Sequence, residues 1–290
     1  MSKKRERPAG RRRIPPTLVV GGTILVLVMA FALAAPLFGN PLHENLTNGL
    51  SVTGMPLGPF SKGYVLGTDT LGRSMLSRLA YGARTSLFVA FVSNITSIGV
   101  GTIFGLVAGF YRGFAETVVM RFTDIGLALP YVLAALVLAT ILPSGITRVI
   151  IIITALFWAY PARLVYGEVL RLRGRGFVEA SVASGASGRS TIRSHLFPHL
   201  MPMLVTYSPL NAASAIFFEA TLSYLGAGVN PPTASWGNMI SDGQSALSIA
   251  PHLLYEPGLM LLVTTAAFLL VGEGLKVLNP DLTRLSWLGA

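Results

Sequence analysis

Polar side chains inside long apolar stretches are the strongest candidates for chemistry in this sequence. Glu219 occurs in the run FFEATLSYLG, and Asn211 lies about two helical turns before it, on roughly the same face. A charge at the centre of a bilayer costs about 3 kcal/mol or more, so such a group should face protein or water. Two interpretations are open. These residues line a path across the membrane, or Glu219 makes a structural hydrogen bond to the loop that follows it.

The histidines do not form a convincing metal site. His195 and His199 have the i, i+4 spacing that places two ligands on one helical face. Pro198 falls between them and no third ligand is evident, whereas zinc sites take three or four ligands. We therefore expect no metal and no resident cofactor in this chain.

Motifs for catalysis and nucleotide binding are also lacking. The pattern GxxxxGK[ST] does not occur, no catalytic triad or carboxylate pair is positioned, and there are no cysteines. We expect that the chain is not an enzyme and does not itself hydrolyse ATP.

A cationic connector between apolar runs, GFVEASVASGASGRSTIRSHLFPHLMP at residues 176–202, has its own local order. Two valines four residues apart favour a short helix, which Gly185 can end in the left-handed conformation. Ser187 can then cap a second short helix, and Pro198 marks the beginning of the next apolar run. The pattern predicts helix, glycine turn, helix. By itself it leaves open a docking surface or an ordinary loop.

This connector resembles the EAA loop of permease subunits in bacterial ABC importers. The family pattern is Glu-Ala-Ala, then a glycine, then a proline, and here it falls on Glu179, Ala180, Ser181, Gly185 and Pro198, with a serine at the third position. The resemblance implies that residues 176–198, Ser187 included, form a coupling helix that sits in a cleft of an ATP-hydrolysing subunit.

Further segments are similar to the dipeptide/oligopeptide/nickel branch of these permeases, in its "C" type. They are GTDTLGRSMLSRLAYGARTSL at residues 67–87 and LSYLGAGVNPPTASWGNMI at residues 222–240. The resemblance implies a type I ABC importer permease for di- or oligopeptides in the bacterial inner membrane. Its partners would be a second permease, two ATPase subunits that bind ATP and Mg²⁺, and an extracytoplasmic peptide-binding protein. Nickel, glutathione or another small solute is the alternative cargo.

The composition independently indicates a multi-pass membrane protein. Hydrophobic residues make up 52% of the 290 residues and charged residues only 12%, whereas soluble domains carry about 25% charged residues. The net charge of +10 is explained by orientation in the lipid membrane, so no nucleic-acid partner is expected.

The apolar runs predict an all-α protein with six transmembrane helices. Of the 22 lysine and arginine residues, 17 fall in segments expected inside and five in segments expected outside, which places both termini in the cytoplasm. The first run ends in a sequence like a signal-peptidase site, but it is too long for a typical signal peptide. The predicted segments are a basic tail (1–16), spans at 17–38, 86–111, 124–142, 146–166, 200–222 and 258–278, outer segments at 39–85 and 223–256, and a cytoplasmic tail (279–290).

Two local patterns add detail to these spans. Gly101, Gly105 and Gly109 repeat every four residues, which predicts a ridge of small residues for close helix packing. The stripe of Leu71, Met75 and Leu79 predicts a short amphipathic helix, begun by a cap at residue 68 or 69. It either lies near the outer membrane surface or packs against the next span, and the pattern leaves both open. An ion-coupled secondary transporter is disfavoured, since no inverted repeat or ion site is evident.

Overall fold

The computed structural model describes residues 14–43, 45 and 47–278, and the named elements of this part of the chain are all helices. Extended structure there is limited to isolated bridges in the segment after the first helix. Five helices are long and apolar enough to cross a membrane, or six if a bent pair counts as one span. The prediction of an all-α, multi-pass protein is confirmed. The predicted tail at 279–290 and most of the one at 1–16 lie outside the described residues.

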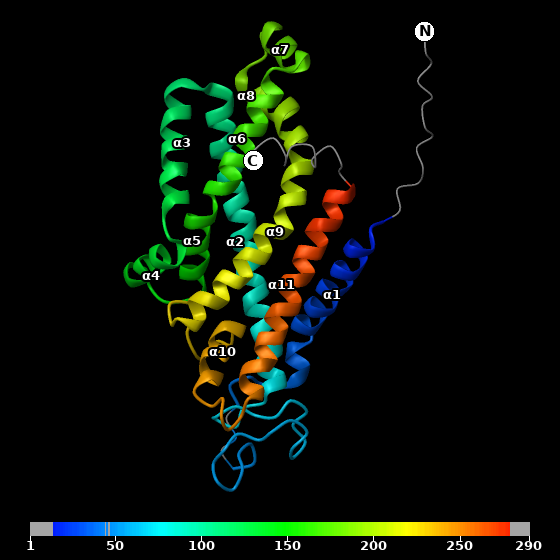
Figure 1. The fold of residues 1–290 in the computed structure, drawn as a ribbon, viewed down its shortest axis with the longest axis vertical. Coiled ribbons are helices and arrows are strands. Elements are labelled where there is room, and N and C mark those ends of the chain that lie inside the picture. Colours follow the sequence, from blue (N-terminus) through cyan, green and yellow to red (C-terminus); the bar gives the residue numbers. More distant parts are fainter. Residues whose placement is uncertain (1–13, 44, 46, 279–290) are drawn as a thin grey trace.

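The helices form an elongated bundle with irregular structure at one end (Figure 1). The long ones are α1 (Pro16–Leu33), α2 (Met75–Tyr111), α3 (Gly113–Ala128), α5 (Ile146–Phe157), α6 (Ala159–Arg173), α9 (Phe197–Tyr224) and α11 (His252–Leu278). The shorter ones are η1 (Ala35–Phe38), α4 (Tyr131–Ile141), α7 (Gly176–Ala183), α8 (Gly188–Thr191), η2 (Ile192–Leu196) and α10 (Trp236–Gln244).

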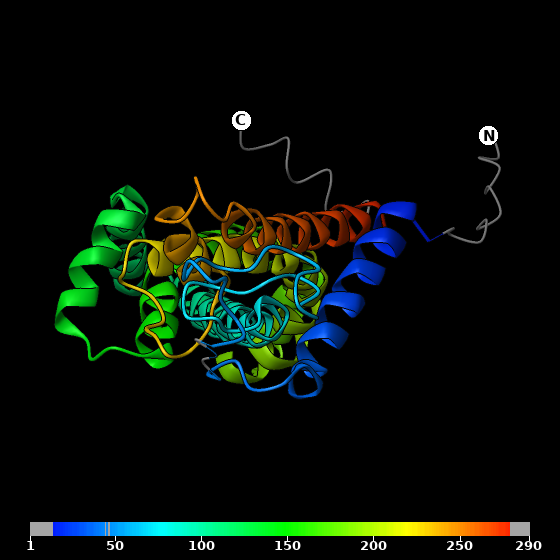
Figure 2. The ribbon, with the colours of Figure 1, turned by 90° about the horizontal axis from the view of Figure 1, so that it is seen from below.

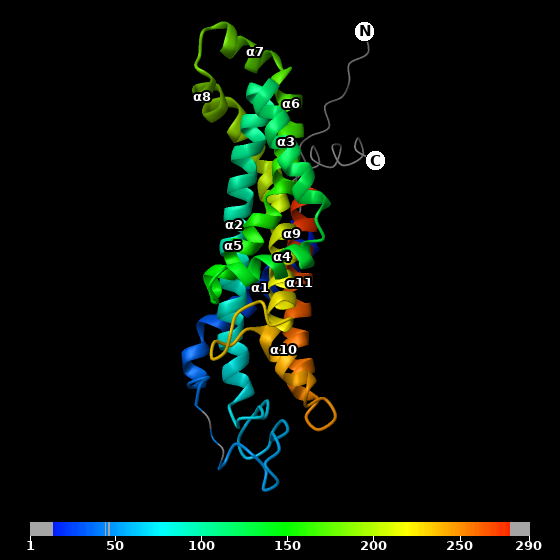
Figure 3. The same ribbon diagram turned by 90° about the vertical axis from the view of Figure 1, so that its left-hand side faces the viewer.

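Helix α2 is the centre of the bundle. It packs against α5, α6 and α9, while α1 packs mainly against α11. Seen from below, α1 lies at one edge and α3 with α4 at the opposite edge (Figure 2). The start of α1 and the end of α11 lie on the same side of the bundle as α7, and the irregular segment before α2 lies at the far end (Figures 1 and 3).

The third predicted span is not one straight helix. Helix α3 begins at Gly113, inside the predicted polar link, and α4 is bent away from it by 99°. The break falls at Leu129 and Pro130: Leu129 has φ −73° and ψ 136°. A proline ring disfavours helical backbone in the residue before it and offers no N–H, so the helix must stop there.

The prediction of an amphipathic helix at the membrane surface is also wrong. Helix α2 runs without interruption from Met75 to Tyr111, so residues 75–85 extend the span itself. Ser74 is the N-cap and accepts a hydrogen bond from the Ser77 amide at 3.5 Å. Met75 and Leu79 are buried in the core beside Trp236. Their apolar stripe therefore contacts protein, not the membrane surface.

Asp69 does not cap a helix but anchors the outer segment. Its carboxylate accepts hydrogen bonds from the amides of Leu71 and Arg73, at 3.0 and 2.8 Å. It also pairs with the guanidinium groups of Arg73 and Arg78. Arg78 reaches Asp242 at 3.3 Å. The outer segment is thus tied to α2 and α10 by a mostly buried network of charges.

The outer segment at 223–256 contains a helix that the sequence pattern did not reveal. Helix α10 begins with a capping box, in which the backbone N–H of Ser235 donates to the Asn238 side-chain oxygen and the backbone N–H of Asn238 donates to the Ser235 hydroxyl. Trp236 is wholly buried, and its indole N–H donates to the Leu79 carbonyl at 3.2 Å. This segment therefore packs into the end of the bundle as an ordered element.

Candidate coupling loop and membrane-embedded site

The connector folds as the sequence predicts, helix, glycine turn, helix. Gly185 has φ +82°, in the left-handed region. Its amide donates to the Val182 carbonyl at 3.0 Å, and the next amide, of Ala186, donates to the Ser181 carbonyl at 3.2 Å. These two bonds make a Schellman ending for α7. The turn is therefore fixed by backbone geometry that glycine adopts without strain.

The second half of the connector is capped by Ser187. Its hydroxyl accepts from the Ser190 amide at 3.3 Å, which confirms the predicted cap. Ser181 and Thr191 share a hydroxyl hydrogen bond of 3.1 Å between the two short helices. Serine at the third position of the Glu-Ala-Ala pattern thus has a defined structural partner.

One face of the connector is anchored and the other is exposed. Val178, Leu196 and Leu200 are buried in an apolar cluster that also holds residues of α2 and α6. Glu179 and Gly185 are exposed, and α7 lies at one tip of the molecule (Figure 3). The remaining predicted coupling residues, Ala180, Ser187 and Pro198, are exposed as well, and Ser181 is half-buried.

An open groove of about 800 Å³ runs beside α7. Glu179 and Val182 line it from the connector, and Phe110, Arg112 and Arg173 line it from the ends of α2 and α6. The exposed end of the connector therefore combines an apolar floor with charged edges.

The two histidines of the connector, His195 and His199, make packing contacts. The connector enters α9 through a π-helical turn, η2, in which the chain gains one extra residue just before Pro198. His199 stacks on Phe177 with ring centroids 4.8 Å apart, and its Nδ1 lies 2.6 Å from the His195 carbonyl. Within the described residues, no group of three or more His, Asp or Glu side chains is placed to hold a metal ion.

The glycine ridge of α2 faces α6, as a helix interface within this chain. A Cβ on Gly101 would lie 2.6 Å from the Trp158 carbonyl oxygen, and one on Gly105 would lie 2.6 Å from that of Ala162. On Gly109 it would lie 2.7 Å from a methyl of Val169. The predicted close packing is confirmed, and its partner is α6.

Glu219 is wholly buried and structural in its contacts. Its carboxyl group accepts hydrogen bonds from the hydroxyls of Ser86 and Ser223, both at 2.8 Å. Those hydroxyls in turn accept from the amides of Trp236 at 3.4 Å and Val229 at 3.1 Å. Glu219 joins α2, α9 and the outer loop, and it lines neither the groove beside α7 nor the pocket at Asn211. The structural interpretation is favoured over a path residue.

Replacing Glu219 with alanine is expected to destabilise the outer end of the bundle. Two buried hydroxyls would lose their acceptor, at a cost of roughly 1–3 kcal/mol for each group left unpaired. The thermal midpoint of the purified complex should fall, whereas Glu273→Ala, at an exposed pair with Lys276, should leave it unchanged. An unchanged midpoint with lost transport would instead assign Glu219 to the path.

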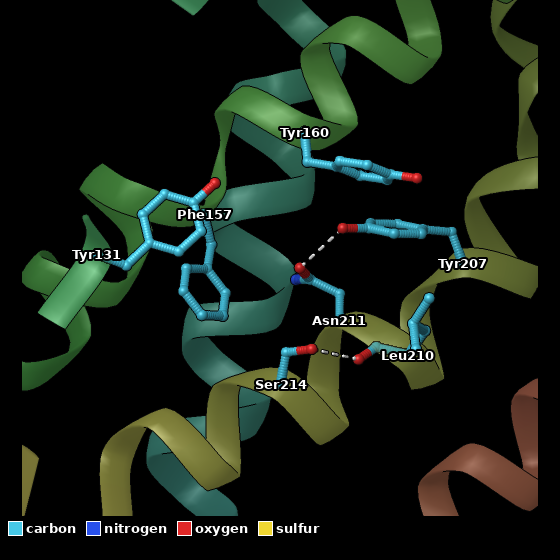
Figure 4. A pocket seen from close by; sticks show the side chains of 7 residues that line it. All are labelled: Tyr131, Phe157, Tyr160, Tyr207, Leu210, Asn211 and Ser214. Carbon is cyan, nitrogen blue, oxygen red and sulfur yellow. Dashed lines mark hydrogen bonds between the residues drawn. The ribbon is translucent and has the colours of Figure 1, made fainter. Parts of the chain in front are cut away.

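Asn211 lies at a pocket in the middle of α9. Its amide donates to Asn94 at 2.9 Å and to Ser97 at 3.0 Å on α2, and its carbonyl accepts from the Tyr207 hydroxyl at 3.1 Å. Figure 4 shows it at the base of a pocket of about 260 Å³. The pocket is lined by Tyr131, Phe157, Tyr160, Tyr207, Leu210, Asn211 and Ser214. Asn211 and Glu219, which the sequence placed together, therefore have different surroundings.

Comparisons with known proteins agree with this architecture. The chain is 37% identical to the oligopeptide transport system permease protein OppC of Bacillus subtilis, over 92% of this chain and 86% of that one. It is 33% identical to the dipeptide transport system permease protein DppC of the same organism, over 94% and 85%. It is 32% identical to the glutathione transport system permease protein GsiD of Pectobacterium atrosepticum, over 91% and 87%.

A solved structure shares the fold. An inward-facing conformation of the MetNI methionine ABC transporter superposes with a TM-score of 0.58 at 20% identity, over 69% of this chain and 94% of that one. The fold is therefore that of an ABC importer permease. The family model described as "Binding-protein-dependent transport system inner membrane component" matches residues 101–282. That range contains the glycine ridge, the bent pair, the connector and both buried polar sites, and the chain belongs to this family of multi-pass inner-membrane permeases.

Proposed function

We propose that this chain imports di- or oligopeptides as one permease of a pair, powered by separate ATPase subunits. The cargo is inferred from the relatives, since the OppC and DppC proteins are oligopeptide and dipeptide permeases. The GsiD relatives are glutathione permeases, and glutathione is itself a small peptide. Nickel or another small solute remains the alternative cargo.

The observation that carries the proposal is the anchoring of the connector. Val178 on α7 and Leu196 on η2 are buried in one cluster with Val165, Val169 and Leu172 of α6. Leu106 of α2 and Leu200, Met203 and Leu204 of α9 complete that cluster. A force applied to the exposed face of α7 would therefore reach α2, α6 and α9 together, because close-packed side chains transmit displacement with little compression.

Two of these helices carry the membrane-embedded pocket. Tyr160 lies at the start of α6, and Tyr207 and Asn211 lie in the middle of α9. Closure of ATPase subunits on the connector would move α2, α6 and α9 together and change the pocket. This is the rigid-body rocking expected of alternating access.

The connector end of the bundle is assigned to the cytoplasm. Arg173, Arg175, Arg189 and Arg193 gather there, in agreement with the excess of basic residues on the cytoplasmic side of membrane proteins. The start of α1 and the end of α11 lie on that side (Figure 1), so both termini are assigned to the cytoplasm. ATPase subunits then dock at the connector, and the peptide-binding protein approaches the opposite end.

Reconstitution tests the proposal. The chain would be placed in proteoliposomes with a second permease, two ATPase subunits and an extracytoplasmic binding protein, and uptake of radiolabelled dipeptide, oligopeptide, glutathione and Ni²⁺ would be compared. We expect ATP-dependent uptake of peptide and no uptake when the ATPase subunits are omitted. Uptake of Ni²⁺ alone would overturn the peptide assignment. Uptake driven by an ion gradient without ATPases would overturn the importer assignment.

A further inference from the structure

Three segments that line one pocket each carry a proline beside it. Pro130 separates α3 from Tyr131, Pro161 follows Tyr160 near the start of α6, and Pro209 lies between Tyr207 and Asn211 in α9. Each proline lacks the amide that would close a helical hydrogen bond. A carbonyl group left unpaired in this way at membrane depth needs a partner from protein or from water in a cavity. Three prolines beside one pocket therefore make it a candidate site.

The pocket lies near the middle of the membrane. Asn211 is about halfway along α9, which runs from Phe197 to Tyr224 and is one of the helices long and apolar enough to span. Tyr160 and Tyr207 are stacked across the pocket, with ring centroids 5.4 Å apart and planes 23° apart (Figure 4). Tyr160 lies on α6 and Tyr207 on α9, and both helices pack against the connector in the apolar cluster described above.

Two hydroxyls in the pocket have no partner within the described part of the chain. The Tyr207 hydroxyl donates to Asn211, but those of Tyr131 and Tyr160 make no hydrogen bond. A hydroxyl facing lipid tails without a partner is costly. Tyr160 is nevertheless 52% exposed. This face is therefore suited to water or a polar ligand, not to lipid.

The chemistry of the residues that line the pocket limits the class of ligand that it can bind. Every lining residue is uncharged, and four of the seven are aromatic. The volume of about 260 Å³ is below the roughly 300–1,000 Å³ typical of sites that hold a whole small-molecule ligand. The free hydroxyls can bond a peptide group, and the rings can contact an apolar side chain. One uncharged residue of a longer peptide fits these hydroxyls and aromatic rings.

We propose that this pocket is a transit subsite that receives one uncharged, preferably aromatic, residue of the peptide during its passage. The inference rests on the proposed import of peptides. Tyr131 and Tyr160 bond the peptide group, while Phe157 and the Tyr160–Tyr207 stack hold the side chain. Asn211 is the positioning residue, because its amide is bound to Asn94 and Ser97 and its carbonyl fixes the Tyr207 ring.

Cysteine protection tests the subsite, since the natural chain contains no cysteine. Ser214→Cys places a thiol on the exposed pocket wall, and Ser144→Cys places one in the exposed turn before α5 as a control. Labelling by a water-soluble methanethiosulfonate would be timed in the full complex during turnover. We expect Ala-Phe-Ala, delivered by its binding protein with ATP, to slow labelling at residue 214 but not at 144. ATP with peptide-free binding protein should not slow it, and Ala-Asp-Ala should protect less.

Equal labelling with and without Ala-Phe-Ala would overturn the subsite. So would a thiol that stays unlabelled in every state, because the second permease would then fill the pocket. Leu210→Cys, on the same wall, provides a second position if the first variant does not assemble. Uptake by the unmodified chain is measured in parallel, and its absence would overturn peptide import itself.

Hydroxyl removal gives an independent readout. Tyr131→Phe and Tyr160→Phe keep the rings and delete the groups assigned to the peptide. We expect the KM for Ala-Phe-Ala uptake to rise about three- to tenfold, which is the effect of losing one modest hydrogen bond. An unchanged KM in both variants would contradict the assigned hydrogen bonds.

Discussion

Replacing Gly185 with valine is expected to reduce peptide uptake by the assembled complex about tenfold or more, while the chain still inserts and folds. The residue has φ +82°, a conformation that costs a β-branched residue about 1–3 kcal/mol. A Cβ there would meet no atom within 4 Å, so the cost is conformational and not a clash. If the backbone relaxes to relieve this cost, the Schellman bonds break and α7 changes direction, together with the exposed face that we propose docks the ATPase.

Uptake and peptide-stimulated ATP hydrolysis of the reconstituted complex are the measurements. Gly176→Val is the matched control, because Gly176 begins α7 with ordinary helical backbone and its added Cβ would also meet open space. Membrane-inserted yield should be equal for the two variants. Normal uptake by the Gly185 variant would remove this turn from the coupling assignment.

Replacing Gly105 with leucine is expected to prevent the bundle from packing. The added Cβ would lie 2.6 Å from the Ala162 carbonyl oxygen and 2.7 Å from the Cβ of Val165. The nearest atom is backbone, so α2 and α6 would have to separate along their contact. Overpacking costs about 1–3 kcal/mol even where side chains can adjust, and here the main contact of the central helix is lost.

The yield of monodisperse chain in detergent and its thermal midpoint would report this loss. Gly99→Leu is the matched control in the same helix, since a Cβ on Gly99 would meet no atom within 4 Å. We expect near-normal yield from the control and little folded protein from the Gly105 variant. Equal yields would contradict the role of the ridge in holding α2 against α6.

Local chemistry made the connector predictable. A glycine that ends a helix and a serine that begins one act through backbone bonds within a few residues, so their types and spacing carry the geometry. The left-handed Gly185 and the Ser187 cap followed for that reason. The ridge of Gly101, Gly105 and Gly109 was readable because helical spacing alone puts the three residues on one face.

The bent third span and the extended second one were harder to predict. Pro130 was visible in the sequence, but prolines also lie inside α9 without ending it. Whether a proline breaks a span depends on what the neighbouring helices do with the freed carbonyl groups. The stripe of Met75 and Leu79 fitted a membrane surface as well as it fitted the core, and only the position of Trp236 decides between them.

Hydropathy, spacing and turn chemistry are local properties, and they were sufficient to predict the class of the protein, most of its membrane helices, the glycine ridge and the form of the connector. The partners of the buried polar groups depend on the tertiary structure. Glu219 and Asn211 share a helix, but the first meets Ser86 and the outer loop and the second meets a pocket of tyrosines. Tyr131, Tyr160 and Tyr207 come from three separate helices, so no spacing along the chain reveals their meeting. Contacts between distant segments depend on how the helices pack, and that packing assigns each polar group its partner.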